Sequence, residues 1–136
     1  MDAFVERMRG ALWGGPATME TQMTQYLIAF DDGDMVFPRE DLPAVAKAVR
    51  EVEEDGRRAG VWVFAAGLEH QVPSVVATDG TVTDGPYPES KEHIGGFTVV
   101  EVPSREAALE WAARIAEACR CAQQVFELMP DDAYSE

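Results

Sequence analysis

Two amphipathic segments of helical length constrain the fold of this chain most. From Asp41 onward, apolar residues recur at alternating steps of three and four, which places them on one helical face. They are Leu42, Val45, Val49, Val52 and Gly56. A second stripe follows Ser104, a good N-cap residue. It consists of Ala108, Trp111, Ala112, Ile115 and Cys119. Each helix therefore needs another layer of structure to cover its apolar face.

Short apolar runs before, between and after these helices are typical of strands. They span residues 26–30, 61–68, 72–78, 97–102 and 123–129. Asp79-Gly80 predicts a two-residue hairpin turn, after which Thr81-Val82-Thr83 returns as a strand. The order is strand, helix, strand, hairpin, strand, helix, strand. It predicts an α+β, ferredoxin-like fold in which two helices cover one face of an antiparallel sheet, with an inserted β-hairpin.

The chain has 136 residues, which is enough for one domain with its own core. Residues 1–23 are separable from it, because Gly14, Gly15 and Pro16 end a short helical pattern there. We interpret 1–23 as an N-terminal arm or leader of uncertain origin. We place the domain at 24–130 and a polar tail at 131–136.

Charge and cysteine content exclude several classes of function. The net charge is −14, from 25 acidic and 11 basic residues, so the surface repels nucleic acid and anionic lipid. No apolar run approaches the roughly 18 residues that span a bilayer. Cys119 and Cys121 are poorly spaced for a structural disulfide. We therefore expect a cytoplasmic protein with no nucleic-acid or membrane partner.

The acidic turn Asp31-Asp32-Gly33-Asp34 invites comparison with a calcium loop. The twelve-position pattern and its terminal glutamate are absent, so a solvated loop is the better interpretation. The two histidines of the chain show no metal-ligand spacing. We expect no metal.

Residues 84–97, DGPYPESKEHIGGF, hold the densest group of candidate functional residues. Asp84 could act as a general base, or could only form the turn with Gly85 and Pro86. Gly95 and Gly96 let the backbone bend, bulge or approach a ligand at the start of a strand. Ionisable side chains on such a loop are a common way to present a functional site.

The other candidates divide into two groups. His70 and His93 could perform acid–base chemistry near neutral pH, so we predict them as catalytic together with Asp84. Tyr87, Glu89 and Lys91 are predicted to bind substrate, although they could instead form an ion-paired loop that orders the turn. Phosphate loops, nucleophile elbows and dinucleotide fingerprints are missing from the sequence, and we expect no cofactor.

The segment DGP-Tyr-x-Glu-x-Lys-Glu-x-x-Gly-Gly-Phe resembles the signature of the DGPF, or YCII-related, proteins. The resemblance runs from Tyr26 to Pro130. It includes Ala59-Gly60, Gly67-Leu68 and the Glu-Trp-Ala-Ala-Arg run 110–114. It implies a dimeric α+β-barrel, in which two sheets face each other and each pocket lies between a sheet and neighbouring loops. The resemblance also implies an enzymatic role, because YCII-like proteins are suspected enzymes. Their relatives include dehydrochlorinase-type lyases that act on chlorinated hydroxyhydroquinones.

Those relatives are thought to use a His–Asp pair with the histidine near the first helix. This chain has no histidine between Thr24 and Glu69, so that pair does not carry over. Tyr87 stands where the family usually has phenylalanine, and Glu69-His70 replaces a commoner glutamine. The arginine usual before Pro130 is replaced by Met129.

The resemblance therefore implies a homodimeric protein with a small-molecule pocket that acts as a cofactor-free lyase or proton-transfer enzyme. The alternative is a non-catalytic regulatory or partner-binding protein. Many DGPF proteins are encoded beside extracytoplasmic-function sigma factors, and this implies a protein partner of that kind. Neither the reaction nor the substrate can be read from the residues.

Overall fold

The computed structural model describes residues 22–85 and 93–130. Its strands and helices follow the predicted order. They are β1 (Thr24–Asp31), the short 3-10 helix η2 (Arg39–Asp41), α2 (Leu42–Ala59), β2 (Trp62–Gly67), β3 (Ser74–Val76), β4 (Val82–Asp84), β5 (Ile94–Val102), α3 (Arg105–Cys119) and β6 (Gln124–Glu127).

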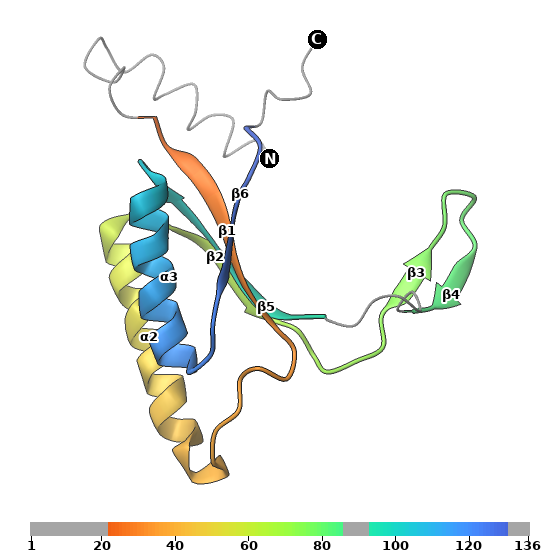
Figure 1. Cartoon of the computed structure of the whole chain (residues 1–136), viewed down its shortest axis with the longest axis horizontal. Coiled ribbons are helices and arrows are strands. Elements are labelled where there is room, and N and C mark those ends of the chain that lie inside the picture. Colours follow the sequence, from red (N-terminus) through yellow and green to blue (C-terminus); the bar gives the residue numbers. More distant parts are fainter. Residues whose placement is uncertain (1–21, 86–92, 131–136) are drawn as a thin grey trace.

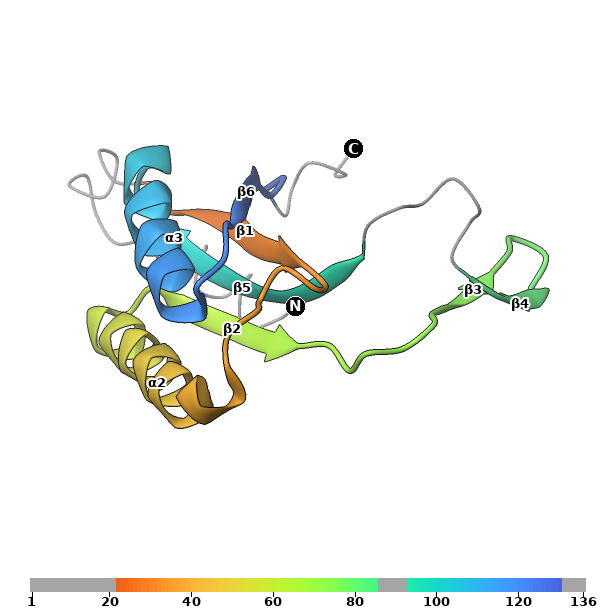
Figure 2. The ribbon, with the colours of Figure 1, turned by 60° about the horizontal axis from the view of Figure 1, so that its bottom comes forward.

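Four of the strands form one antiparallel sheet in the order β2-β5-β1-β6. Both long helices cover the same face of this sheet (Figures 1 and 2). The two central strands, β1 and β5, are those that precede the helices α2 and α3, and the edge strands, β2 and β6, are those that follow them. This confirms the ferredoxin-like prediction. Within the described ranges, none of the helices has the length and apolar character needed to cross a membrane.

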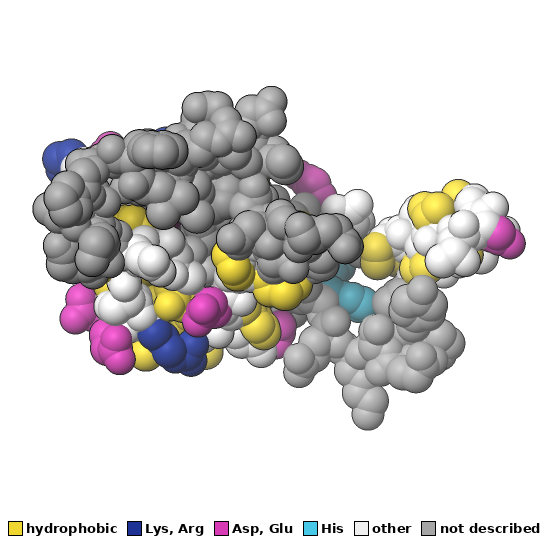
Figure 3. Space-filling model, turned by 90° about the horizontal axis from the view of Figure 1, so that it is seen from above, with side chains coloured by type: hydrophobic (Ala, Val, Ile, Leu, Met, Phe, Trp, Pro, Cys, Tyr) yellow, Lys and Arg dark blue, Asp and Glu magenta, His cyan; other side chains and the backbone are white. Residues whose placement is uncertain are grey.

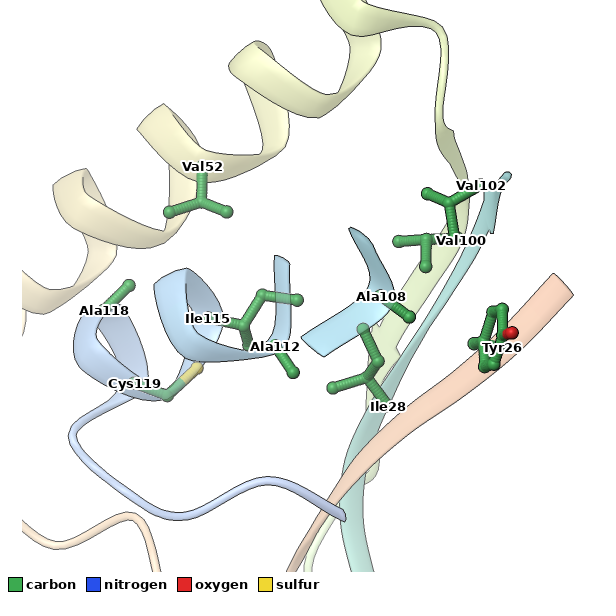
Figure 4. Close-up of a cluster of buried hydrophobic side chains, with 10 residues drawn as sticks. All are labelled: Tyr26, Ile28, Val52, Val100, Val102, Ala108, Ala112, Ile115, Ala118 and Cys119. Atoms are coloured by element: carbon green, nitrogen blue, oxygen red, sulfur yellow. The ribbon is translucent and has the colours of Figure 1, made fainter. Parts of the chain in front are cut away.

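The core lies between the helices and the sheet (Figure 4). Ile28, Val100 and Val102 are almost completely buried on the sheet side, and Val52 and Ile115 meet them from α2 and α3. Ser104 begins α3 as predicted, because its hydroxyl accepts a hydrogen bond from the Ala107 amide at 3.1 Å. The alternating burial along β5 explains why one face of this strand reads as apolar in the sequence.

The opposite face of the sheet carries several apolar side chains together with Gln25 and the buried Glu101, and we call it the open face. The strand register pairs Leu27 with both Val99 and Phe126, and Phe64 with Val99, so all four side chains lie on this face. The rings of Phe64 and Phe97 lie 5.9 Å apart at their centroids. Phe64 and Phe126 are about half exposed. No described helix or strand covers this face (Figure 2).

The inserted β3–β4 hairpin stands away from the rest of the molecule in both ribbon views (Figures 1 and 2). We call residues 73–85 the protruding hairpin. The Gly85 amide donates to the Pro73 carbonyl at 2.6 Å and closes its base. Strand β3 begins only at Ser74, later than predicted, because Pro73 has no amide to give to the ladder.

The turn of this hairpin differs from the two-residue loop predicted from Asp79-Gly80. The Gly80 amide donates to the Ala77 carbonyl at 2.9 Å, and the Ala77 amide donates to Thr81 at 2.8 Å. Three residues therefore separate the paired ends. Gly80 has φ of 90°, which is the left-handed conformation needed in a three-residue loop with a bulge. Asp79 reinforces the turn through its carboxylate, which accepts from the Thr81 amide at 2.9 Å.

Candidate active site

Three chain segments meet at the end of the sheet where β1 and β2 end and β5 begins. The Asp32 amide donates to the His93 carbonyl at 2.5 Å. On the other side of the same strand, the Leu68 amide donates to the Gly95 carbonyl at 2.9 Å. These two hydrogen bonds hold the segment after β1 and the segment after β2 against the start of β5.

The side chains of His70 and Asp32 form a pair at this sheet end. His70 Nδ1 lies 3.0 Å from Asp32 Oδ2. A carboxylate can only accept here, so Nδ1 carries the proton and neutral His70 presents Nε2 as an acceptor. The His70 side chain is 92% exposed and that of Asp32 is 34% exposed. Nε2 is thus free to take a proton from a ligand, and the carboxylate stabilises the imidazolium that results.

Gly95 and Gly96 make room for this arrangement. A Cβ atom on Gly95 would lie 2.9 Å from both the Asp32 Cα and the ring of Phe30. A Cβ atom on Gly96 would lie 2.7 Å from the same ring. The predicted close approach at this glycine pair is therefore to the chain's own backbone at Asp32 and to Phe30. Gly95 thus makes room for the Asp32 backbone, and both glycines make room for the Phe30 ring.

A cavity of about 310 Å³ lies between the sheet and the two helices. Its walls are mainly apolar and include Val52 of α2, Ile115 of α3 and Met35 of the β1–α2 loop. Phe30 and Gly67 also line it. These two residues lie near the ends of β1 and β2 and precede Asp32 and His70 by two and three positions, but Asp32 and His70 themselves do not line the cavity.

The polar groups of the cavity wall are few. They include the Thr98, Gln123 and Glu53 side chains and the Cys119 thiol. Burial, and to a smaller extent the neighbouring Cys121, raise the pKa of the Cys119 thiol to about 11. The thiol is therefore protonated at neutral pH and is not a thiolate nucleophile. The Glu53 carboxylate of the wall is ion-paired with Arg57 at 2.7 Å, and the His70–Asp32 pair lies outside the wall, just after the strands that carry Phe30 and Gly67.

The structure separates the predicted site residues. Asp84 lies at the end of β4 on the protruding hairpin, with its side chain exposed. His93 contributes its backbone carbonyl to the position of Asp32. Tyr87, Glu89 and Lys91 lie outside the described residues. Among residues 22–85 and 93–130, no three potential ligands of the His, Cys, Asp or Glu type gather to hold a metal ion.

Asp32 is the functional candidate that sequence reasoning missed. The acidic turn after the first strand was interpreted as a solvated loop, and 38 residues separate Asp32 from His70. The predicted strand order could have indicated that Asp32 and His70 lie close together. In an antiparallel sheet of this order, the ends of β1 and β2 lie beside the start of β5, so polar residues just after both strands meet.

Two comparisons with known proteins bear on identity. The family model described as the YCII-related domain matches residues 23–129, nearly the whole described chain. A search of curated proteins finds no match. The family match agrees with the ferredoxin-like topology and with the resemblance that the sequence itself carries. The chain belongs to the YCII-related domain family.

Proposed function

We propose that this protein is a proton-transfer enzyme of the lyase type, in which His70 is the general base and Asp32 orients it. The observation that carries the proposal is the 3.0 Å contact between His70 Nδ1 and Asp32 Oδ2, which follow closely in sequence the cavity-lining residues Gly67 and Phe30. A paired histidine that keeps one ring nitrogen free is suited to remove a proton near neutral pH. The reaction needs no cofactor for this step.

The cavity supports a small, largely apolar substrate. Its walls come from α2, α3 and the sheet, and its charged groups are few. Such a lining favours an uncharged ring or a short hydrocarbon body over a phosphorylated metabolite. A hydroxylated aromatic ring combines an apolar body with an acidic proton, and it is the substrate class we propose.

In a lyase reaction on a chlorinated hydroxyhydroquinone, the ring would first shift to its keto tautomer, in which the carbon that bears chlorine is tetrahedral. His70 Nε2 would then take the proton of a ring hydroxyl, a C=O bond and a ring C=C bond would form, and chloride would leave with its bonding electron pair. The products are a hydroxybenzoquinone and HCl. Asp32 would stabilise the imidazolium through the proton on Nδ1. This substrate class comes from the family resemblance. The histidine that those relatives are thought to use is absent from this chain, and His70, paired with Asp32, would act as the base instead.

We also place the enzyme in the cytoplasm as a homodimer of the DGPF type. The open face of the sheet supports the dimer, because Phe64 and Phe126 expose apolar rings on it. Apolar faces of this kind are commonly covered by another subunit.

The test is chloride release from a chlorinated hydroxyhydroquinone by the full-length protein. We expect His70→Asn to lower the rate by at least ~10²-fold, because a positioned general base contributes about that much. Asp32→Asn should also lower the rate, through loss of the orienting charge. Asp34→Asn and Gln71→Ala are the matched controls, since each changes a neighbour of one member of the pair.

Melting temperatures of all four variants should stay close to that of the wild type, because the side chains of the pair are exposed or half exposed. Wild-type activity that survives His70→Asn would remove the histidine from the mechanism. A wild type that neither releases chloride nor is stabilised by hydroxylated aromatic compounds would overturn the proposed substrate class.

A further inference from the structure

The Thr98 hydroxyl is a polar group inside the core that the fold itself does not use. Thr98 is 7% exposed and lies in β5, a central strand of the sheet. The register pairs it with Ile28 on one side and Ala65 on the other, so its side chain points toward the helices, as that of the buried Ile28 does. Within residues 22–85 and 93–130, the Thr98 hydroxyl neither donates nor accepts a hydrogen bond.

This hydroxyl faces the cavity between the sheet and the two helices. Thr98 belongs to the wall of the cavity, whose volume is about 310 Å³. Trp62 Nε1, from the same wall, is also unpaired, but it is enclosed on all sides. The Thr98 oxygen is unpaired without being enclosed, so the small surface that Thr98 retains includes this oxygen. A molecule in the cavity can therefore contact the Thr98 hydroxyl.

The neighbours of Thr98 account for the space around it and for the cost of keeping a hydroxyl there. Ala65 and Gly67 of β2 are small and leave a hollow under α2, and the wall opposite is apolar, with Val52 and Ile115. A hydroxyl without a partner in apolar surroundings destabilises the folded state, whereas valine has the same shape without this cost. Threonine is therefore the better residue at this position only when something in the cavity supplies the partner.

We propose that the Thr98 hydroxyl hydrogen-bonds the ligand of the cavity, and that it favours a neutral ring compound with a hydroxyl or carbonyl oxygen over a hydrocarbon of the same shape. One polar contact in an apolar lining fixes the orientation of such a ligand. Histidine side chains are visible at the surface between the body and the protruding hairpin (Figure 3), whereas Thr98 is buried. The inference rests on the proposed role of the cavity as the substrate site. It is independent of the proton transfer by His70.

Binding of phenol and of toluene to the full-length protein tests this contact, because the two rings have nearly the same shape and only phenol has an oxygen. We expect Thr98→Val to weaken phenol binding about 2–10-fold, the contribution of one hydrogen bond between neutral groups, and to leave toluene binding unchanged. NMR titration measures both affinities, and shifts of the Ile115 and Val52 methyl resonances place the ring in the cavity.

Two further variants are the controls. Thr98→Ser retains the hydroxyl and should retain the difference between phenol and toluene. Thr83→Val makes the same substitution on the exposed strand β4, and should change neither affinity. His70→Asn should bind phenol as the wild type does, so the Thr98 contact stays measurable even if the proposed proton transfer fails.

The stability of the ligand-free protein should change in the opposite direction to its phenol affinity. Thr98→Val removes an unpaired hydroxyl and keeps the volume of the side chain, so the melting temperature should rise by about 2–6 °C. A lower melting temperature would mean that the hydroxyl has a partner within the fold, and would overturn the inference.

The binding outcomes separate this inference from the proposed function. Equal phenol affinity in the wild type and in Thr98→Val would overturn the Thr98 contact alone, because water would then be the only partner of the hydroxyl. Equal weakening of phenol and toluene would also overturn it, since a changed cavity shape would explain both losses. A wild type that binds neither ring would overturn the ligand-binding role of the cavity together with the contact.

Discussion

The body of the protein and its protruding hairpin are both antiparallel β-structure, yet different interactions stabilise them. In the body, two helices bury one face of a four-stranded sheet, and residues such as Ile28 and Val100 lose all contact with water. In the hairpin, the paired valines Val76 and Val82 stay mostly exposed. A strand pattern in the sequence thus predicts that two strands pair. Whether the paired strands bury a hydrophobic core depends on whether helices follow them in the chain and pack on them, as α2 and α3 do in the body.

The largest difference between the two regions should appear on truncating an aliphatic side chain. Ile28→Ala removes a fully buried side chain from the core and should lower the free energy of unfolding by about 2–5 kcal/mol. Val82→Ala on the hairpin should change it by no more than about 0.5 kcal/mol. Urea unfolding, followed by circular dichroism at a concentration where the protein is monomeric, measures both. Similar losses for the two variants would show that the hairpin belongs to the core.

A smaller effect is expected at the junction between the two regions. Gly95→Ala would place a methyl group 2.9 Å from the Asp32 Cα and the Phe30 ring, so we expect a loss of about 1–3 kcal/mol from overpacking. The His70 ring should also shift its NMR resonances, because its partner is displaced. Gly67→Ala is the control. Its Cβ would meet nothing closer than 4.0 Å, and a loss comparable to that of Gly95→Ala would contradict this explanation.

The smallest effect concerns two carboxylates in acid. Hydrogen bonds from Arg114 and then Arg58 lower the pKa of Asp55 in the body, and the Thr81 amide lowers the pKa of Asp79 in the hairpin turn. A carboxyl whose folded pKa is depressed contributes stability above its unfolded pKa, 3.8 here, and loses it as pH falls through the folded value. Both contributions should therefore begin to fall near pH 4 and be lost only as the pH drops below the depressed folded pKa.

The two carboxylates should nevertheless be distinguishable. Asp55 links α2 to Arg114 of α3, so Asp55→Asn should reduce the acid dependence of global unfolding. Asp79→Asn should leave global unfolding unchanged and only speed exchange of the hairpin amides. Denaturant midpoints between pH 3 and pH 6 and hydrogen exchange separate these cases. An equal change in the unfolding midpoint for both variants would contradict the independence of the hairpin.

Much of the fold was predictable because its signals are local. The stripe from Leu42 to Gly56 and the N-cap at Ser104 each arise within one helix, and the strands next to them follow from short apolar runs. The hairpin turn was predicted one residue too short, because the Asp-Gly pair occurs in both two-residue and three-residue loops.

The site was less predictable because its geometry is not local. His70 was a candidate from its chemistry alone, but its partner Asp32 lies in a loop whose residues read as solvated. Only the strand order, which brings the ends of β1 and β2 to the start of β5, places them together. Asp84 follows a hairpin signal that local reasoning detects, whereas the projection of that hairpin from the body depends on the path of the whole chain.

The hydrogen bond that closes the base of the hairpin has a consequence for engineering. Because the Gly85 amide meets the Pro73 carbonyl, the two ends of the loop stay adjacent whatever lies between them. The anchor of Leu68 on Gly95 comes before the chain leaves the sheet. Residues 74–84 are thus an interchangeable cassette: a foreign peptide of another length could replace them without moving the histidine, and would be displayed far from the rest of the surface.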